Sequence, residues 1–204
     1  MSNPLLTMTD LPPFAHIKPE HIKPAVEQAI TDCRNNVEAV LSQFQMPTWE
    51  TICRPLAELD DRLGRIWSPV GHLNGVKNSP ELRQAYESCL PLLSDYATWV
   101  GQHKGLYDAY KMIRASDDFA DLSQAQQKAV TDALKAFELS GIGLPAEQQQ
   151  RFGEISKRLS ELASTFSNNV LDATMAWSKV ITDVDQLQGL PASALQAAQA
   201  NAQA

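Results

Sequence analysis

The sequence lacks every short motif that would place an enzymatic centre in it. It contains no H-E-x-x-H zinc motif, no G-x-G-x-x-G or G-x-x-x-x-G-K-[ST] phosphate loop, no G-x-S-x-G and no calcium-binding EF-hand loop. We therefore expect no catalytic, cofactor-binding or metal-binding residue in this chain.

Clusters of basic residues and long apolar runs are also missing. The 17 lysines and arginines are scattered among 24 acidic residues, which leaves a net charge of −7. This balance disfavours nucleic acid and anionic membrane surfaces as partners, because both require clustered cations. The N-terminus has no signal peptide and no stretch approaches the length of a membrane span. We expect a cytoplasmic protein with no nucleic-acid or membrane partner.

Cysteine is scarce, with only Cys33, Cys53 and Cys89, and no two of them form a C-x-x-C pair. An odd number of widely spaced thiols does not indicate a disulfide framework or a zinc site. We interpret them as small buried apolar residues in a reducing compartment.

Apolar residues recur every three or four positions, which is the period of an α-helix buried on one side. This pattern predicts an all-α fold of long antiparallel helices, kinked where Pro55, Pro69 and Pro91 interrupt it. The apolar stripes comprise Ile22, Val26, Ala29, Cys33, Val37, Val40 and Phe44; Ile52, Leu56, Leu59, Leu63, Ile66, Val70 and Leu73; Leu82, Tyr86, Cys89, Leu93, Tyr96 and Val100; and Phe152, Ile155, Leu159, Leu162, Phe166, Val170, Ala173 and Trp177.

Several helix ends can be read from local sequence. Ser79 before Pro80 is a favourable N-cap, and Ser123 with Gln126 forms an S-x-x-Q capping box. Gly141 is suited to end a helix because glycine readily adopts the left-handed backbone conformation found there.

The chain divides into three expected parts. Residues 1–18 are rich in proline and predict an extended segment, residues 19–177 form the helical domain, and residues 178–204 are the truncated start of a following region. Within the last part, 178–182 is the one candidate strand, and it would be an orphan because no partner is present. The alanine-rich helix that reaches Ala204 has no cap, so we expect a larger protein.

Two groups of histidines are candidate sites. His16, Glu20 and His21 superficially resemble a metal set, but Pro19 lies between them and zinc catalysis needs three protein ligands, so we interpret them as polar residues at a helix start. His72 and His103 lie on different helices, and no nucleophile that either could serve is identifiable.

The acidic pairs and the tryptophans also have simpler interpretations. Neighbouring residues on a helix point about 100° apart, so Asp60-Asp61 and Asp117-Asp118 make poor carboxylate dyads and are expected at the solvated surface. The tryptophans could line a substrate groove, although such residues more often fill cores or seams between domains. They are Trp49, Trp67, Trp99 and Trp177.

Four segments together resemble the N-terminal part of the thimet oligopeptidase family of zinc metallopeptidases. The similarity runs in order along nearly the whole chain, although no segment is a catalytic motif. The segments are Asn3–Leu6 continuing through Leu11–Phe14 to Val26; Pro55–Glu58 with Leu63–Ile66 and His72–Asn74; Phe137–Pro145; and Leu159–Leu162 through Phe166–Thr174.

The resemblance implies a larger helical metallopeptidase of two lobes around a deep channel, in which a zinc-activated water cleaves short peptides. In that family an H-E-x-x-H helix and a further glutamate hold the zinc and supply the general base, and none of these positions exists here. The resemblance thus implies that this chain is the N-terminal helical lobe, forms one wall of the channel, and is inactive without the missing C-terminal catalytic region. The alternative is a stand-alone helical protein-interaction module without enzymatic activity.

Overall fold

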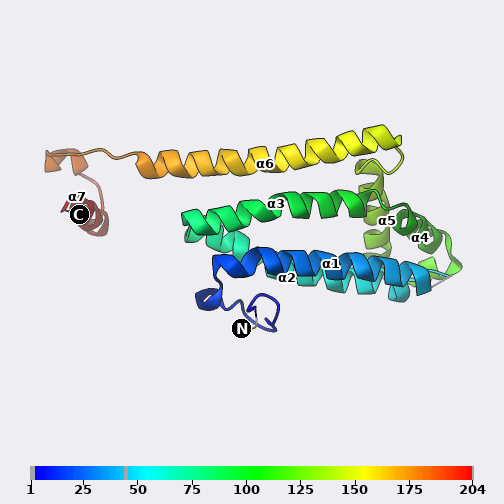
Figure 1. Cartoon of the computed structure of the whole chain (residues 1–204). Coiled ribbons are helices and arrows are strands. Elements are labelled where there is room, and N and C mark those ends of the chain that lie inside the picture. The colour runs from blue at the N-terminus through cyan, green and yellow to red at the C-terminus, as the bar shows by residue number, and fades with distance from the viewer. Residues whose placement is uncertain (1–2, 44–45, 204) are drawn as a thin grey trace. The chain divides into compact units, whose positions relative to one another are not determined.

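The computed structural model describes residues 3–43 and 46–203, and all regular structure in these two ranges is helical (Figure 1). This confirms the all-α prediction. Within the described ranges no helix combines the length and apolar character needed to cross a membrane. The α-helices there are α1 (Pro19–Gln43), α2 (Arg54–Val76), α3 (Pro80–Gly101), α4 (Lys104–Ala115), α5 (Gln124–Leu139), α6 (Ala146–Ala176) and α7 (Ala192–Gln203).

The chain separates into two compact units, residues 1–164 and residues 165–204, and each is described by itself. The first unit contains α1 to α5 and the first part of α6. The second unit contains the rest of α6, a short 3₁₀ turn at Val184–Leu187, and α7.

The first unit is built on an up-down-up arrangement of α1, α2 and α3, in which α1 packs against both of the others (Figure 1). The apolar stripe predicted for α1 is buried, except that Phe44 lies outside the described residues. The N-terminal part of this stripe packs with Ile66, Val70 and Cys89 of the neighbouring helices in one core. Burying such side chains is the main favourable contribution to folding, about 25 cal/mol per Å² of apolar surface.

The short N-terminal segment covers this bundle. Leu5 is buried in the same core, and a 3₁₀ turn at Phe14–His16 precedes α1. The Asn3 side-chain amide donates a hydrogen bond of 2.7 Å to the carbonyl of His21, which ties the segment to the first turn of α1.

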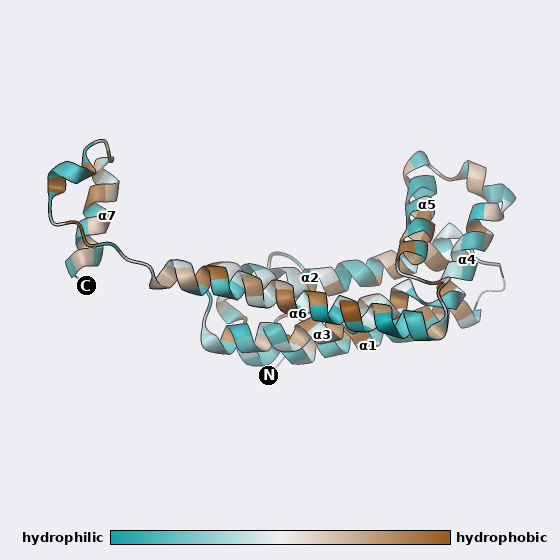
Figure 2. Cartoon of the chain, turned by 90° about the horizontal axis from the view of Figure 1, so that it is seen from above, coloured by the Kyte–Doolittle hydropathy of each residue, from teal (hydrophilic) through white to brown (hydrophobic). Residues whose placement is uncertain are grey.

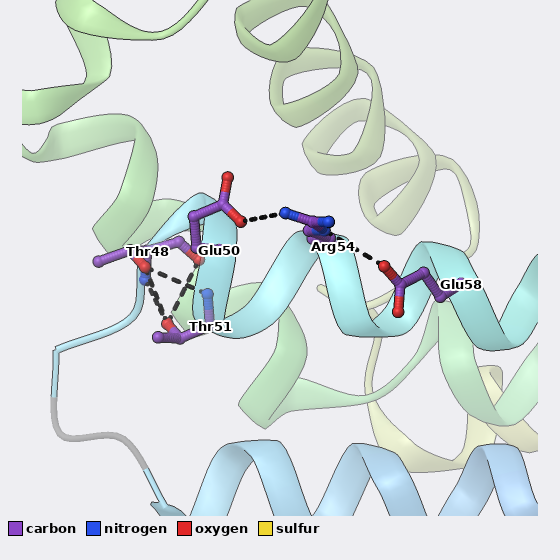
Figure 3. A network of polar contacts seen from close by, with 5 residues as sticks. All are labelled: Thr48, Glu50, Thr51, Arg54 and Glu58. Atoms are coloured by element: carbon purple, nitrogen blue, oxygen red, sulfur yellow. Dashed lines mark hydrogen bonds and ion pairs between the residues drawn. The ribbon is translucent and has the colours of Figure 1, made fainter.

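The start of α2 is fixed by its own side chains. A π-helical turn at Trp49–Cys53 leads into the helix, and Thr48 caps it: the Thr51 amide donates to Thr48 Oγ1 at 3.2 Å. Arg54 then contacts Glu50 at 3.0 Å and Glu58 at 3.2 Å (Figure 3). These ion pairs are exposed, so they are expected to contribute little to stability beyond orienting this turn.

The predicted helix ends are confirmed. Ser79 Oγ accepts the Leu82 amide at 3.2 Å, and Ser123 with Gln126 forms the complete capping box of α5. Gly141, just beyond α5, has a φ of 82°, a left-handed conformation that favours glycine.

The kinks expected at Pro55, Pro69 and Pro91 stay a prediction, and the helices that contain these prolines are continuous. Pro55 lies in the first turn of α2, where its missing N–H removes no helical hydrogen bond. Pro69 and Pro91 lie inside α2 and α3, each of which is one continuous helix.

Helices α4 and α5 close one end of the bundle. They pack against each other, and a second apolar cluster there joins Ile113 and Val130 to Val40 of α1 and Ile52 before α2. A third cluster brings Val37 of α1 together with Leu106 and Phe137.

Helix α6 differs from α1 although its apolar period is as regular, because none of its residues is buried. In the first unit Ile155, Leu159 and Leu162 are exposed, and Gln149 and Lys157 make polar contacts toward α3. Apolar and polar positions alternate along the helix (Figure 2). The helix predicted from this stripe is present, and the described residues leave most of the stripe exposed.

The strand considered at 178–182 is absent from the second unit. Residues 177–183 form neither helix nor strand there, and no described segment pairs with them, so they lack the ladder of hydrogen bonds that a strand needs. Trp177 is 72% exposed, and α7 has no buried residue.

The contrast between α1–α3 and α6 predicts two different responses to truncation. Ile66→Ala removes a side chain that is 2% exposed and should lower the free energy of unfolding by about 2–5 kcal/mol. Leu159→Ala, at a position 61% exposed, should change it by less than about 0.5 kcal/mol. Urea unfolding followed by circular dichroism at 222 nm measures both, and an equal loss would show that α6 is packed in solution.

The second unit should exchange its amide hydrogens readily. A helix of this length without a buried face is marginal in water, so amides of 178–203 should show little protection while those of α1 are strongly protected. Hydrogen exchange of a dilute monomer read by mass spectrometry is the measurement. Strong protection throughout 178–203 would contradict this expectation.

Candidate functional site

A cavity of about 420 Å³ lies in the first unit, between the ends of α2 and α3 and the helices α4 and α5. Most of its wall is apolar, and its few polar side chains include one carboxylate and two phenols. The residues that define it here are Leu56, Asp60, Tyr96, Val100, Tyr110 and Phe137.

Helical spacing explains how these residues meet. Leu56 and Asp60 are four residues apart on α2, and Tyr96 and Val100 are four apart on α3. Residues at this spacing share one face of a helix, so each helix contributes a short apolar row that ends in a polar group.

A glycine allows the helices to approach at one side of the cavity. A Cβ atom placed on Gly101 would lie 2.6 Å from Cβ of Ser140, closer than two such atoms can come. Gly101 is therefore required for the end of α3 to pass the end of α5 at this distance.

The polar side of the cavity is the pair of Asp60 and Tyr96. The Tyr96 hydroxyl donates a hydrogen bond of 3.1 Å to Asp60 Oδ1. Desolvation raises the pKa of Asp60 although its side chain is exposed at the rim, and the bond from Tyr96 acts in the opposite direction. Burial also raises the pKa of Tyr96, so the phenol stays protonated and remains a donor.

The cysteines are all buried, as the sequence predicted. Burial raises the pKa of Cys53 to about 11 and raises the pKa of Cys33 and Cys89 as well. A thiol with a raised pKa is protonated at neutral pH, and the thiolate is the reactive form. These residues therefore act as apolar core side chains.

The residues weighed as a metal set are engaged in local contacts. His21 Nδ1 accepts the Lys18 amide at 3.1 Å, and a Glu20 carboxylate oxygen lies 3.9 Å from Lys18 Nζ. His16 is exposed at the end of its 3₁₀ turn. This supports their interpretation as polar residues around a helix start.

The other two histidines have structural contacts. His103 caps α4, because its Nδ1 accepts the Leu106 amide at 3.2 Å, while its Nε2 lies 3.3 Å from Glu38. Accepting at Nδ1 requires the proton to be on Nε2, which can then donate to Glu38. The exposed His72 ring lies 5.4 Å from the ring of Phe14.

The four tryptophans do not line one common groove: Trp67 and Trp99 both pack against the first apolar cluster, through different contacts. Trp67 stacks on Tyr86 with ring centroids 4.7 Å apart, and Trp99 carries the Arg34 guanidinium 4.8 Å above its ring. Trp49 packs on the second apolar cluster. Trp177, in the second unit, is exposed.

All four residues of the two acidic pairs are exposed, as expected, and one of them also lines the cavity. Asp61 is exposed and lies 3.7 Å from Arg65, and Asp117 and Asp118 are exposed in a 3₁₀ turn. Asp60 is exposed, as expected for this pair, and it also lines the rim of the cavity. Its spacing of four from Leu56 is a signal that could have indicated this position.

The described residues do not fit a zinc ion. No three His, Cys, Asp or Glu side chains converge anywhere in the described ranges, whereas zinc is held by at least three protein ligands. No catalytic step through zinc can be built on these residues, and that the chain carries no site residue stays a prediction.

Residues 26–149 match the family described as Neurolysin/Thimet oligopeptidase, N-terminal domain. The chain belongs to this family. It is 64% identical over all of its 204 residues to Oligopeptidase A of Escherichia coli K12, and covers 30% of that protein. It is 39% identical over 197 residues to the Probable cytosolic oligopeptidase A of Arabidopsis thaliana, and over 194 to the Organellar oligopeptidase A, chloroplastic/mitochondrial, of the same plant. Each of these two matches includes 95% of this chain, and the matched part makes up 28% of the first plant protein and 24% of the second.

The raised pKa of Asp60 predicts a pH-dependent contribution to stability. The folded state holds the proton more tightly than the unfolded state, so this group destabilises the fold progressively as pH rises from about 3.8 through its raised pKa. Asp60→Asn cannot ionise, so its free energy of unfolding relative to the parent should increase over that interval. Urea titrations at pH 3.5 to 7 measure this, with Asp61→Asn as the exposed control. A flat difference for Asp60→Asn would contradict the prediction.

Proposed function

We propose that this chain is the N-terminal, non-catalytic helical portion of a cytoplasmic zinc metallo-oligopeptidase that hydrolyses short peptides. The observation that carries the proposal is the match of the whole chain to Oligopeptidase A of E. coli, of which it spans 30%. In this proposal the chain forms one wall of the substrate channel, and the zinc and the groups that activate water belong to the C-terminal catalytic region.

The first unit supports a scaffold role. Several of its polar candidates form helix caps and exposed ion pairs, as with His103 on Leu106 and Asp61 with Arg65. Its core joins five helices into a stable body. A channel wall that orients substrates and takes no part in the reaction needs these properties.

The exposed face of α6 supports an extended packing surface. Within the first unit Ile155, Leu159 and Leu162 leave apolar side chains in water, and within the second unit Phe166 and Val170 do the same. Exposed apolar patches of this kind mark surfaces that another polypeptide covers. In the proposed enzyme the catalytic region is that polypeptide.

The same apolar face favours a second candidate, a helical interaction module that acts without a peptidase region. The two candidates differ in what the gene encodes after Ala204. An open reading frame with a downstream H-E-x-x-H supports the peptidase, and a stop codon supports the module.

The isolated chain should not cleave peptides. Purified protein incubated with short fluorogenic peptides and added zinc should give the same signal as buffer, because the described residues offer no set of zinc ligands. Adding the catalytic region in trans tests whether activity then appears. Cleavage by the isolated chain that a chelator abolishes would overturn the proposal.

A further inference from the structure

We propose that the cavity bounded by α2, α3, α4 and α5 is a binding site for a small amphipathic cation, a protonated amine attached to an aromatic or branched apolar group. The inference rests on the walls of the cavity, on the single carboxylate that lines it, and on the partners of that carboxylate. It is independent of the proposed peptidase function.

The walls suit the apolar part of such a ligand. A volume of about 420 Å³ falls within the range of small-molecule pockets, which is roughly 300–1,000 Å³. Leu56, Val100 and Phe137 supply aliphatic and aromatic surface, and Tyr110 adds a half-buried ring.

The carboxylate suits the cationic part. Asp60 is the one charged residue of the cavity lining. Asp60 accepts a hydrogen bond from the Tyr96 hydroxyl. Within the described ranges no basic side chain lies within ion-pairing distance of its carboxylate. A carboxylate in partly desolvated surroundings gains more from an ammonium group than one in open water, because the local dielectric is lower.

The arginines nearest to Asp60 along α2 already form ion pairs with other carboxylates. Arg54 contacts Glu50 and Glu58, and Arg62 lies 3.7 Å from Asp32. Asp60 therefore has no competing protein partner on its own helix, which distinguishes it from Asp61 beside Arg65. The same charge disfavours anionic ligands, and a neutral ligand would leave the carboxylate without a counter-charge.

The aromatic rings add a second preference for a cation. Tyr96 and Tyr110 both line the cavity, and the face of such a ring attracts an ammonium group within about 6 Å of its centre. An amine bound beside Asp60 would therefore meet both a carboxylate and aromatic surface.

The test uses phenethylamine as the probe and phenethyl alcohol as its neutral isostere, each titrated into the ¹⁵N-labelled chain at pH 7. We expect phenethylamine to shift amide resonances of the segments that line the cavity, and to bind at least tenfold more tightly than the alcohol. Asp60→Asn should weaken phenethylamine binding at least tenfold and leave alcohol binding unchanged. Asp61→Asn, the matched control on the same helix, should bind as the parent does.

A second pair of variants separates loss of the cavity from loss of the fold. Ala136 is exposed and lines the cavity, so Ala136→Leu should occupy it and abolish binding of both probes. Ala129, exposed on the same helix but outside the cavity, provides the control Ala129→Leu, which should bind normally. Shifts confined to other segments, equal affinity for the amine and the alcohol, or parent-like amine binding by Asp60→Asn would overturn the proposal.

Discussion

The burial of one face of α1 is the constraint on which the first unit depends. Its apolar stripe passes through all three apolar clusters: Ile22 and Cys33 lie in the cluster shared with α2 and α3, Val37 in the one shared with α4 and α5, and Val40 in the one that includes Ile52. Among the helices that the structure describes, α1 alone contributes buried side chains to all three clusters. A change that displaced α1 would therefore loosen both the bundle and its closed end.

The cavity follows from how the helices meet at that end. Helix α5 runs across the direction of α1 to α3 rather than along it (Figure 1), so its side chains cannot interdigitate with the bundle along a common axis. Gly101 lets the end of α3 approach the end of α5 at one point, and Tyr96 and Phe137 line the space that remains. The resulting space is lined by apolar surface with a single charged group at its rim.

The sequence specified the helices well because their signals are local. The stripe from Ile22 to Val40, the cap at Ser79 and the left-handed Gly141 each depend on residues within a few positions of one another. The environment of Asp60 was not predictable in this way. It depends on Tyr96, 36 residues away on another helix, and the spacing of four from Leu56 indicates only that Leu56 and Asp60 share a helix face. The candidate segment 178–182 forms no strand for a related reason, because a strand needs a partner elsewhere in the chain.

Helix α6 shows why periodicity alone does not establish burial. Its stripe is as regular as that of α1, yet Leu159 and Phe166 are exposed, because amphipathicity states which face would be buried and not whether anything covers it. Most helical stability in proteins comes from packing of that face rather than from propensity. A helix of 31 residues without a buried side chain is thus incompletely stabilised by the residues described. The chain spans 30% of Oligopeptidase A of E. coli, and under the proposed function the catalytic region would cover this stripe.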